Sequence, residues 1–339
     1  MNIELRKKIK QNWDNIIKPI DSLGDFEDLV AELGAVLEDE RVNLFPATLI
    51  TFCADNGVIK EGVAQSDESV TLTVAKSFAN RNSCVCLMAD EAGIDIYPVN
   101  IGMKLDIDMP GIKNNIVAKG TKDFYIEKAM TKKEMEKAFL VGADTLSEVT
   151  KNGAKCVLLG EMGIGNTTTS AAVISALLKV DANEITGRGA GLNDEGLLIK
   201  KRVINESIKK YNLFEADAKE VLSCVGGFDI CGMVGVILKA VELSVPVILD
   251  GLITAAAALA ACKIDERAID YIFFTHEGKE KGVVKVADYL GKKTYIKGNL
   301  ALGEGSGAVA FMALLKNIKT IYDTQASFEE RGMEAYKRF

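Results

Sequence analysis

The sequence predicts an α/β fold built on a parallel sheet, and three observations lead to this prediction. Short, almost purely apolar runs recur along the 339 residues, as buried parallel strands require. Longer segments that are rich in alanine or amphipathic separate these runs. Hydrophobic residues make up 48% of the chain, which is enough for a substantial core. Strands that alternate with helices in this way form parallel sheets.

The expected strands are apolar runs that end in small or acidic residues. In chain order they are ATLITFCADNG, GIDIYPVNIG, AKCVLLGEMG, VPVILDG and AIDYIFFTHEG. Because each run is apolar throughout, each is expected to be buried on both faces of the sheet. The helices expected between them are TTTSAAVISALLK, DEGLLIKKRVINESIKKY, GMVGVILKAVELS and LITAAAALAACK.

The two ends of the chain have a different pattern. Residues 3–23 and 26–37 mix charged and apolar residues at helical spacing, and residues 317–339 are charged with a helical pattern. We predict that residues 1–30 and 317–339 pair as a small helical domain beside a large α/β domain of residues 31–316.

Composition argues against several classes of protein. Acidic and basic residues are interspersed and the net charge is −7, whereas a nucleic-acid-binding surface needs a basic patch. No apolar run is long enough to span a bilayer, and residues 1–10 lack the apolar core of a signal peptide. We therefore expect a cytoplasmic protein with no nucleic-acid partner and no membrane contact.

The cysteines and the histidine do not indicate metal or redox chemistry. The seven cysteines form no CxxC pair, and most lie in apolar segments such as KCVLL, so we expect buried, reduced thiols. His276 is the only histidine, which disfavours a histidine-rich metal site and a Ser-His-Asp triad. No metal site is therefore predicted.

A ligand is expected beyond the carboxyl ends of the strands, as in other open α/β sheets. Polar and small residues follow four of the apolar runs, at residues 55–57, 160–163, 250–251 and 275–278. A fifth group, residues 303–307, opens another helix of small residues. These five groups are the candidates for the functional site.

The first glycine-rich turn, GEMGIGNTTTSAA, joins a predicted strand to a predicted helix. Gly163 and Gly165 let a phosphate approach the backbone, the helix start attracts an anion, and Thr167 adds a hydroxyl donor. A tight turn with a threonine cap explains the pattern equally well. The motif matches neither GxxxxGK[ST] nor the dinucleotide fingerprint, which argues against a P-loop kinase and a dinucleotide-dependent oxidoreductase.

The second turn, GRGAGLNDEGLLIKK, places Lys200 about two turns into the helix that follows. A lysine there can meet a phosphate as a point charge, but these residues alone favour an ordinary surface lysine. The third turn, LGEGSGAVAF, sets Glu304 between glycines. Glu304 fits either an acid that complements a helix start or a partly desolvated general base, and periodicity does not separate the two.

Taken together, the motifs resemble the nicotinate-nucleotide:dimethylbenzimidazole phosphoribosyltransferase family. The matching stretches, in order, are CADNGVIKEGVAQS, GEMGIGNTTTSAA, GRGAGL with Lys200, VGGFDICGMVG, PVILDGLITAAAALAA, THEGKEKG and LGEGSGA. They cover residues 53–308, which is most of the chain. The resemblance implies a Rossmann-like large domain, a small helical domain formed by the chain ends, and a homodimer with active sites near the subunit contact.

The resemblance also implies a reaction and the residues that serve it. The reaction moves ribose 5-phosphate from nicotinate mononucleotide to a lower-ligand base used in cobalamin synthesis, giving an α-ribazole-type phosphate and nicotinate. It needs no metal and no organic cofactor. The implied catalytic residues are Glu304 as general base, Glu161 and Lys200. The implied substrate-binding residues are Gly163, Gly165, Asn166, Thr167, Gly189, Asp250 and Gly251.

The acceptor base is the open point of this resemblance. The family usually has ADHG where this chain has residues 54–57, ADNG, and apolar Val74 replaces a polar residue near the base, whereas Ser66 is retained. A benzimidazole, a purine or a phenol therefore fits. Relatives that activate phenols work as two-chain assemblies, so a heterodimer with a paralogue, or a non-catalytic subunit, is the alternative. The presence of Glu304, Glu161 and Lys200 argues against the non-catalytic reading.

Overall fold

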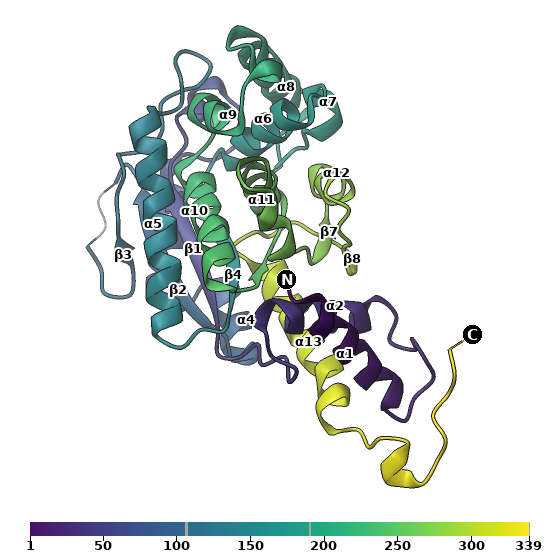
Figure 1. The fold of residues 1–339 in the computed structure, drawn as a ribbon. Coiled ribbons are helices and arrows are strands. Elements are labelled where there is room, and N and C mark those ends of the chain that lie inside the picture. Colours follow the sequence, from purple (N-terminus) through teal and green to yellow (C-terminus); the bar gives the residue numbers. More distant parts are fainter. Residues whose placement is uncertain (106–107, 190, 339) are drawn as a thin grey trace.

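The computed structural model of the chain describes residues 1–105, 108–189 and 191–338. These residues contain a six-stranded sheet in which all neighbouring strands are parallel, in the order β3-β2-β1-β4-β5-β6 (Figure 1). The order is that of the Rossmann fold, so the predicted α/β class and its Rossmann-like sheet are confirmed. The strands are β1 (Ala47–Ala54), β2 (Asp95–Gly102), β3 (Lys113–Asn114), β4 (Cys156–Met162), β5 (Val247–Ile248) and β6 (Ile272–Phe273).

Each of the five predicted apolar runs contains a strand, although β5 and β6 pair over only two residues each. The run AIDYIFFTHEG holds a second strand after β6, the short β7 (His276–Gly278), which pairs with β8 (Ile296–Leu300) in a separate parallel ribbon. Strands β8 and β3, the exposed edge dipeptide Lys113–Asn114, were not expected, because neither segment carries an apolar run.

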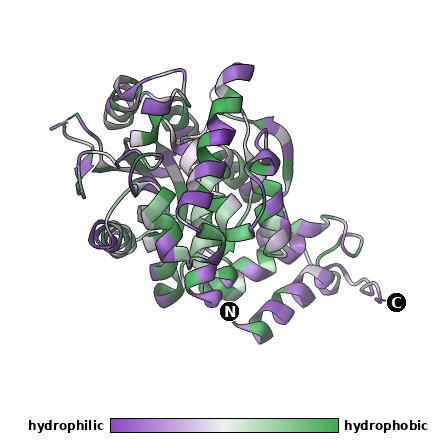
Figure 2. Ribbon diagram, turned by 90° about the horizontal axis from the view of Figure 1, so that it is seen from above, coloured by the Kyte–Doolittle hydropathy of each residue, from purple (hydrophilic) through white to green (hydrophobic). Residues whose placement is uncertain are grey.

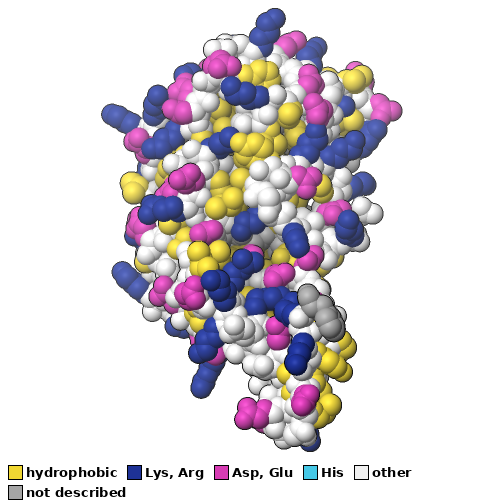
Figure 3. Space-filling view, turned by 45° about the vertical axis from the view of Figure 1, so that its right-hand side comes forward, with side chains coloured by type: hydrophobic (Ala, Val, Ile, Leu, Met, Phe, Trp, Pro, Cys, Tyr) yellow, Lys and Arg dark blue, Asp and Glu magenta, His cyan; other side chains and the backbone are white. Residues whose placement is uncertain are grey.

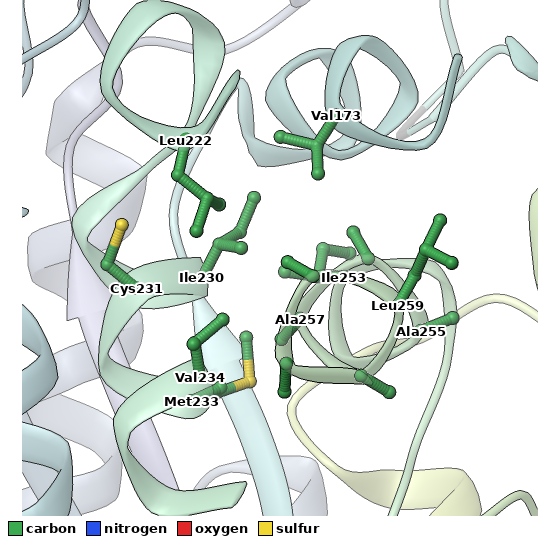
Figure 4. Close-up of a cluster of buried hydrophobic side chains, with 14 of the residues drawn as sticks. Val173, Leu222, Ile230, Cys231, Met233, Val234, Ile253, Ala255, Ala257 and Leu259 are labelled. Carbon is green, nitrogen blue, oxygen red and sulfur yellow. The ribbon is translucent and has the colours of Figure 1, made fainter. Parts of the chain in front are cut away.

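Helices cover both faces of the sheet. One face carries α5 (Lys132–Lys151), α6 (Asn166–Leu178), α9 (Ala218–Val225), α10 (Phe228–Leu243) and α11 (Leu252–Ile264). Ile50 and Phe52 of β1 point into the core on this side. Figure 4 shows side chains from α6, α9, α10 and α11, such as Val173, Leu222 and Ile230, turned toward one another. Further out lie α7 (Ala182–Ile185), α8 (Asp194–Lys210) and α12 (Gly282–Tyr289).

The opposite face has its own core. Leu49 and Cys53 of β1 point to this side, one residue out of phase with those that face α10, as strand geometry requires. The helices here are α1 (Ile3–Asn15), α2 (Asp25–Leu37), α3 (Glu68–Ala79), α4 (Cys84–Ala92) and α13 (Ser306–Thr324). Short 3-10 helices occur at Gly57–Glu61, Leu213–Glu215, Glu266–Asp270 and Glu329–Arg331.

Helices from the two ends of the chain, α1 and α13, lie side by side on this second face (Figure 1). The Trp13 ring of α1 packs against the Tyr322 ring of α13 with centroids 4.9 Å apart. Both terminal helices end earlier than predicted. Helix α1 ends at Asn15 instead of residue 23, because Pro19 has no N–H to donate. Helix α13 ends at Thr324 instead of residue 339. Residue 339 lies outside the described residues. The division into a small and a large domain stays a prediction.

The hydrophobic residues gather toward the centre of the molecule and the hydrophilic ones on its outer helix faces (Figure 2). On the face drawn in Figure 3, acidic and basic side chains intermingle. Cys53 and Cys156 are buried as expected, but Cys84 is exposed because it occupies the outer side of the first turn of α4. No helix in the described part of the chain is long and apolar enough to cross a membrane.

Candidate active site

A cavity of about 320 Å³ opens at the carboxyl ends of β4, β5 and β6. The strand order reverses between β1 and β4, and ligands of open α/β sheets bind beside such a reversal. The cavity is lined by most of the residues predicted from sequence. These are Ser66, Val74, Glu161, Gly163, Asn166, Thr167, Gly189, Asp250, Gly251 and Glu304. Of the other two, Gly165 caps the start of α6 and Lys200 reaches Thr167. The structure therefore brings the predicted site residues together.

Glu304 lies in a turn of three consecutive left-handed residues. Gly303, Glu304 and Gly305 have φ angles of 82°, 62° and 93°, and α13 begins immediately afterwards. A left-handed conformation is costly for a glutamate, about 1–2 kcal/mol, and such strain is typical of functional positions. The carboxylate accepts a hydrogen bond at 3.3 Å from the N–H of Val85, in the first turn of α4. Glu304 thus complements the start of α4 rather than that of its own helix.

The second predicted glutamate, Glu161, is buried at the end of β4. The side-chain amide of Asn166 donates hydrogen bonds to both Glu161 and Asp229, to the latter at 3.1 Å. Burial, reinforced by the negative charge of Asp229, raises the pKa of Glu161 to about 8, so this carboxyl is protonated at neutral pH. Burial also raises the pKa of Asp229 to about 6. Burial therefore disfavours simultaneous ionisation of the two carboxyl groups.

The two glutamates are held at adjoining turns. The backbone N–H of Glu304 hydrogen-bonds to the Glu161 carboxyl, which partly offsets the rise in its pKa. Gly160, the residue before Glu161, faces the carbonyl of Glu304 so closely that a Cβ at this position would overlap the carbonyl oxygen. Glycine at position 160 therefore sets the height of the Glu304 turn above the sheet.

Lys200 is not the surface lysine that its local sequence favours. Its side chain is 1% exposed, and Nζ donates to Thr167 Oγ1 at 2.8 Å. The amphipathic α8 turns this residue inward, and burial lowers its pKa to about 8. Gly189 lies beside the pair, since a Cβ there would be 3.4 Å from Lys200 Nζ. Ala190, in the same turn, lies outside the described residues. A cation, a hydroxyl and a glycine-rich backbone therefore meet at one corner of the cavity.

Asp250 links the end of β5 to the start of α13. Its Oδ1 accepts hydrogen bonds from the backbone N–H groups of Gly307 at 2.7 Å and Ala308 at 3.2 Å. Burial raises the pKa of Asp250 to about 6, although these two bonds favour the ionised form. Asp250 therefore lines the cavity and also anchors the helix that carries Glu304.

His276, from the predicted group 275–278, lines the cavity. Two other residues belong to recognised motifs but were not predicted as site residues. Glu280 of THEGKEKG lines the cavity, and Asp229 of VGGFDICGMVG accepts a hydrogen bond from Asn166 without lining it. Burial lowers the pKa of His276. An apolar wall is formed by Val70 and Val74, one turn apart on α3, together with residues such as Leu252 and Leu302.

The cavity thus combines polar and cationic groups, an apolar wall and carboxyl groups between glycine-rich turns. Within the described ranges, no group of three or more His, Cys, Asp or Glu side chains is placed to hold a metal ion. Such a lining can hold a phosphate and a flat apolar ring, with a carboxylate available to move a proton.

Comparison with known proteins agrees with this arrangement. A family profile described as phosphoribosyltransferase matches residues 1–333. A nicotinate-nucleotide–dimethylbenzimidazole phosphoribosyltransferase from Ruminiclostridium cellulolyticum is 36% identical over 341 residues, covering 99% of this chain and 96% of the relative. The enzyme of the same name from Clostridium perfringens is 35% identical, covering 96% of this chain and 91% of the relative.

A solved structure has the same fold over nearly the whole chain. CobT from Thermus thermophilus matches with a TM-score of 0.93 at 30% identity, covering 98% of this chain and 100% of that one. On the combined extent of these similarities, the chain belongs to the nicotinate-nucleotide:dimethylbenzimidazole phosphoribosyltransferase family.

Proposed function

We propose that the protein transfers ribose 5-phosphate from nicotinate mononucleotide to an aromatic lower-ligand base, dimethylbenzimidazole or a related compound, with Glu304 as general base. The names of the relatives support the reaction. The observation that carries the proposal is one cavity that holds both the Glu304 carboxylate and the Lys200–Thr167–Gly189 corner. The products are an α-ribazole-type phosphate and nicotinate.

Glu304 acts on the acceptor. The nicotinate nitrogen is cationic in the donor, so it leaves with the electron pair of the breaking C1′–N bond and needs no general acid. The acceptor forms the new bond to C1′ from the opposite face, and Glu304 takes its N–H or O–H proton. A positioned carboxylate typically contributes about 10²–10⁴-fold in such a step.

The remaining residues position the donor and stabilise the developing charge. Lys200, Thr167 and Gly189 hold the phosphate, as a buried cation with neighbouring N–H and O–H donors can. The negative charge shared by Glu161 and Asp229 lies where it can stabilise a cationic sugar during transfer. Gly251 lets substrate approach the backbone, because a Cβ there would meet its nearest atom only at 4.0 Å. Gly163 and Gly165 instead let their turn pack closely against Ala54 and Ile59.

An assay with several acceptors tests this function. We expect nicotinate release and an equimolar ribosylated product when the pure protein is incubated with nicotinate mononucleotide and dimethylbenzimidazole, adenine, phenol or p-cresol in turn. The apolar wall at Val70 and Val74 favours the acceptors with the fewest polar atoms. Absence of turnover with every acceptor would rule out catalysis by the isolated chain. Activity that appears only when a paralogous chain is added would support a heterodimer over a homodimer. The oligomeric state and the cytoplasmic location both stay predictions.

Activity is expected to fall in alkaline solution. Because burial lowers the pKa of Lys200 to about 8, the free enzyme loses this positive charge as the pH rises through that value. A neutral amine holds a phosphate dianion poorly, so kcat/KM for nicotinate mononucleotide should decrease there. A pH profile of kcat/KM measures the change, since this quantity reports ionisations of the free enzyme.

Two variants separate the groups that titrate in this range. Lys200→Met should lower kcat/KM at neutral pH and remove the alkaline decrease. Glu161→Gln should keep the decrease, although Glu161 also has a pKa of about 8. If the alkaline decrease in kcat/KM disappears in Glu161→Gln but persists in Lys200→Met, the decrease is caused by Glu161 and the assignment to Lys200 is wrong.

A further inference from the structure

The corner assigned to the substrate phosphate also contains a carboxylate of the protein. Glu280 follows β7, and its Oε1 accepts a hydrogen bond at 2.9 Å from the backbone N–H of Gly189. Its other oxygen, Oε2, is buried and has no hydrogen-bond partner among the described residues. Glu280 lines the cavity together with Thr167. The Glu280 carboxylate therefore occupies the Gly189 N–H, a hydrogen-bond donor that a bound phosphate would need.

The surroundings of Glu280 are built for an anion. The negative charge of Glu280 acts on Lys200, whose pKa it raises against the larger lowering caused by burial. Lys200 in turn donates to Thr167, whose Oγ1 would lie 2.7 Å from a Cβ on Gly189. A Cβ on Gly187 would overlap the Glu280 carboxylate, so only glycine at position 187 leaves room for the acid. The Gly189 N–H and the nearby positive charge of Lys200 thus favour an anion at the position of the Glu280 carboxylate.

We propose that Glu280 is a resident anion of the phosphate corner, which the substrate phosphate displaces on binding and which returns when the product leaves. The inference rests on the proposed function. Two anions cannot share the Gly189 N–H and the Lys200 charge without strong repulsion. The apparent affinity for phosphate is therefore reduced by the fraction of molecules in which Glu280 occupies the corner.

The proposal gives Glu280 a role in release as well as in binding. Donor and product carry the same 5′-phosphate, so an acid that competes with phosphate weakens the binding of both. A weaker hold on the donor raises KM, and a weaker hold on the product speeds its departure, which limits kcat in many enzymes. Removal of the charge should therefore lower KM without raising kcat.

Calorimetry with inorganic phosphate tests the proposal directly. Glu280→Gln keeps the size of the side chain and removes its charge. We expect this variant to bind phosphate about tenfold more tightly than the wild type, which corresponds to about 1.4 kcal/mol. Glu280→Ala should gain at least as much, because no side-chain oxygen remains to accept from Gly189. Adding Lys200→Met to Glu280→Gln should abolish the gain.

Glu277→Gln is the matched control. Glu277 lies on β7, three residues before Glu280, pairs with Lys297 at 3.1 Å and does not line the cavity, so phosphate affinity should equal that of the wild type. The proposal is overturned if neither Glu280 variant binds phosphate more tightly. It is also overturned if both bind nicotinate mononucleotide more weakly, since Glu280 would then hold the ribose.

The calorimetric result does not depend on turnover. A chain that shows the gain in phosphate affinity but transfers to no acceptor would contradict the proposed function and leave the anion-binding corner in place. A chain that transfers normally, with unchanged phosphate affinity in the Glu280 variants, would contradict only the role of Glu280.

Discussion

Glu304→Gln is expected to lower kcat by about 10²–10⁴-fold, the usual contribution of a positioned general base. The amide keeps the size of the side chain and can still accept the hydrogen bond from Val85, so the turn and the helix behind it should remain in place. KM for nicotinate mononucleotide should change little, because the proposed phosphate site at Lys200 and Gly189 is left intact. Steady-state kinetics with a saturating acceptor, together with the melting temperature, check both parts.

Glu38→Gln is the matched control for this variant. Glu38 is another glutamate with a left-handed backbone, φ 52°, but it is exposed at the end of α2 and does not line the cavity. It should keep full activity. A kcat for Glu304→Gln within a few-fold of the wild type would show that another group takes the acceptor proton.

Gly160→Ala is expected to lower kcat by about 10²-fold without any change in a group that touches substrate. The added methyl would overlap the carbonyl oxygen of Glu304 and lie 2.8 Å from Thr51 Cγ2. The central strand β4 is held on both sides by β1 and β5, so the Glu304 turn has to move instead. Overpacking of this kind also costs stability, typically about 1–3 kcal/mol. Kinetics and urea unfolding of the same preparation measure the two effects.

Gly298→Ala provides the comparison for the added methyl. Gly298 is in β8, where a Cβ would meet its nearest atom at an ordinary 3.5 Å, so activity and stability should stay close to those of the wild type. A folded Gly160→Ala protein with normal kcat would mean that the height of the Glu304 turn is not critical. The urea curve distinguishes that outcome from loss of the fold.

The fold could be predicted from sequence because its central strands are uniform apolar runs and its helices keep their period. Such signals report burial directly, and Leu49 and Phe52 lie in opposite cores as a buried parallel strand requires. Elements with little burial gave no signal. The exposed strand β3 is one example. The tail after Thr324 has the opposite mismatch, since its helical pattern predicts a helix but it forms only a short 3-10 helix at Glu329–Arg331.

The site was predictable only in part, and the reason is spatial. Glu304 and Lys200 could be located through motifs, yet their own neighbourhoods in sequence left Glu304 ambiguous and suggested a surface position for Lys200. The burial of Lys200 arises from packing of α8 against α6, which brings Thr167 to it across 33 positions. Asp229 and Glu280 were overlooked for the same reason, since their partners Asn166 and Gly189 are distant in the chain.

The apolar wall on α3 has a practical consequence for engineering. Val70 and Val74 belong to a helix that supplies neither Glu304, Glu161 nor Lys200, so the element proposed to face the acceptor is separate from those proposed to bind the donor. A combinatorial library confined to these two valines would vary acceptor preference while donor binding and proton transfer stay constant. Selection for growth on different bases could then evolve new substrate ranges on an unchanged catalytic framework.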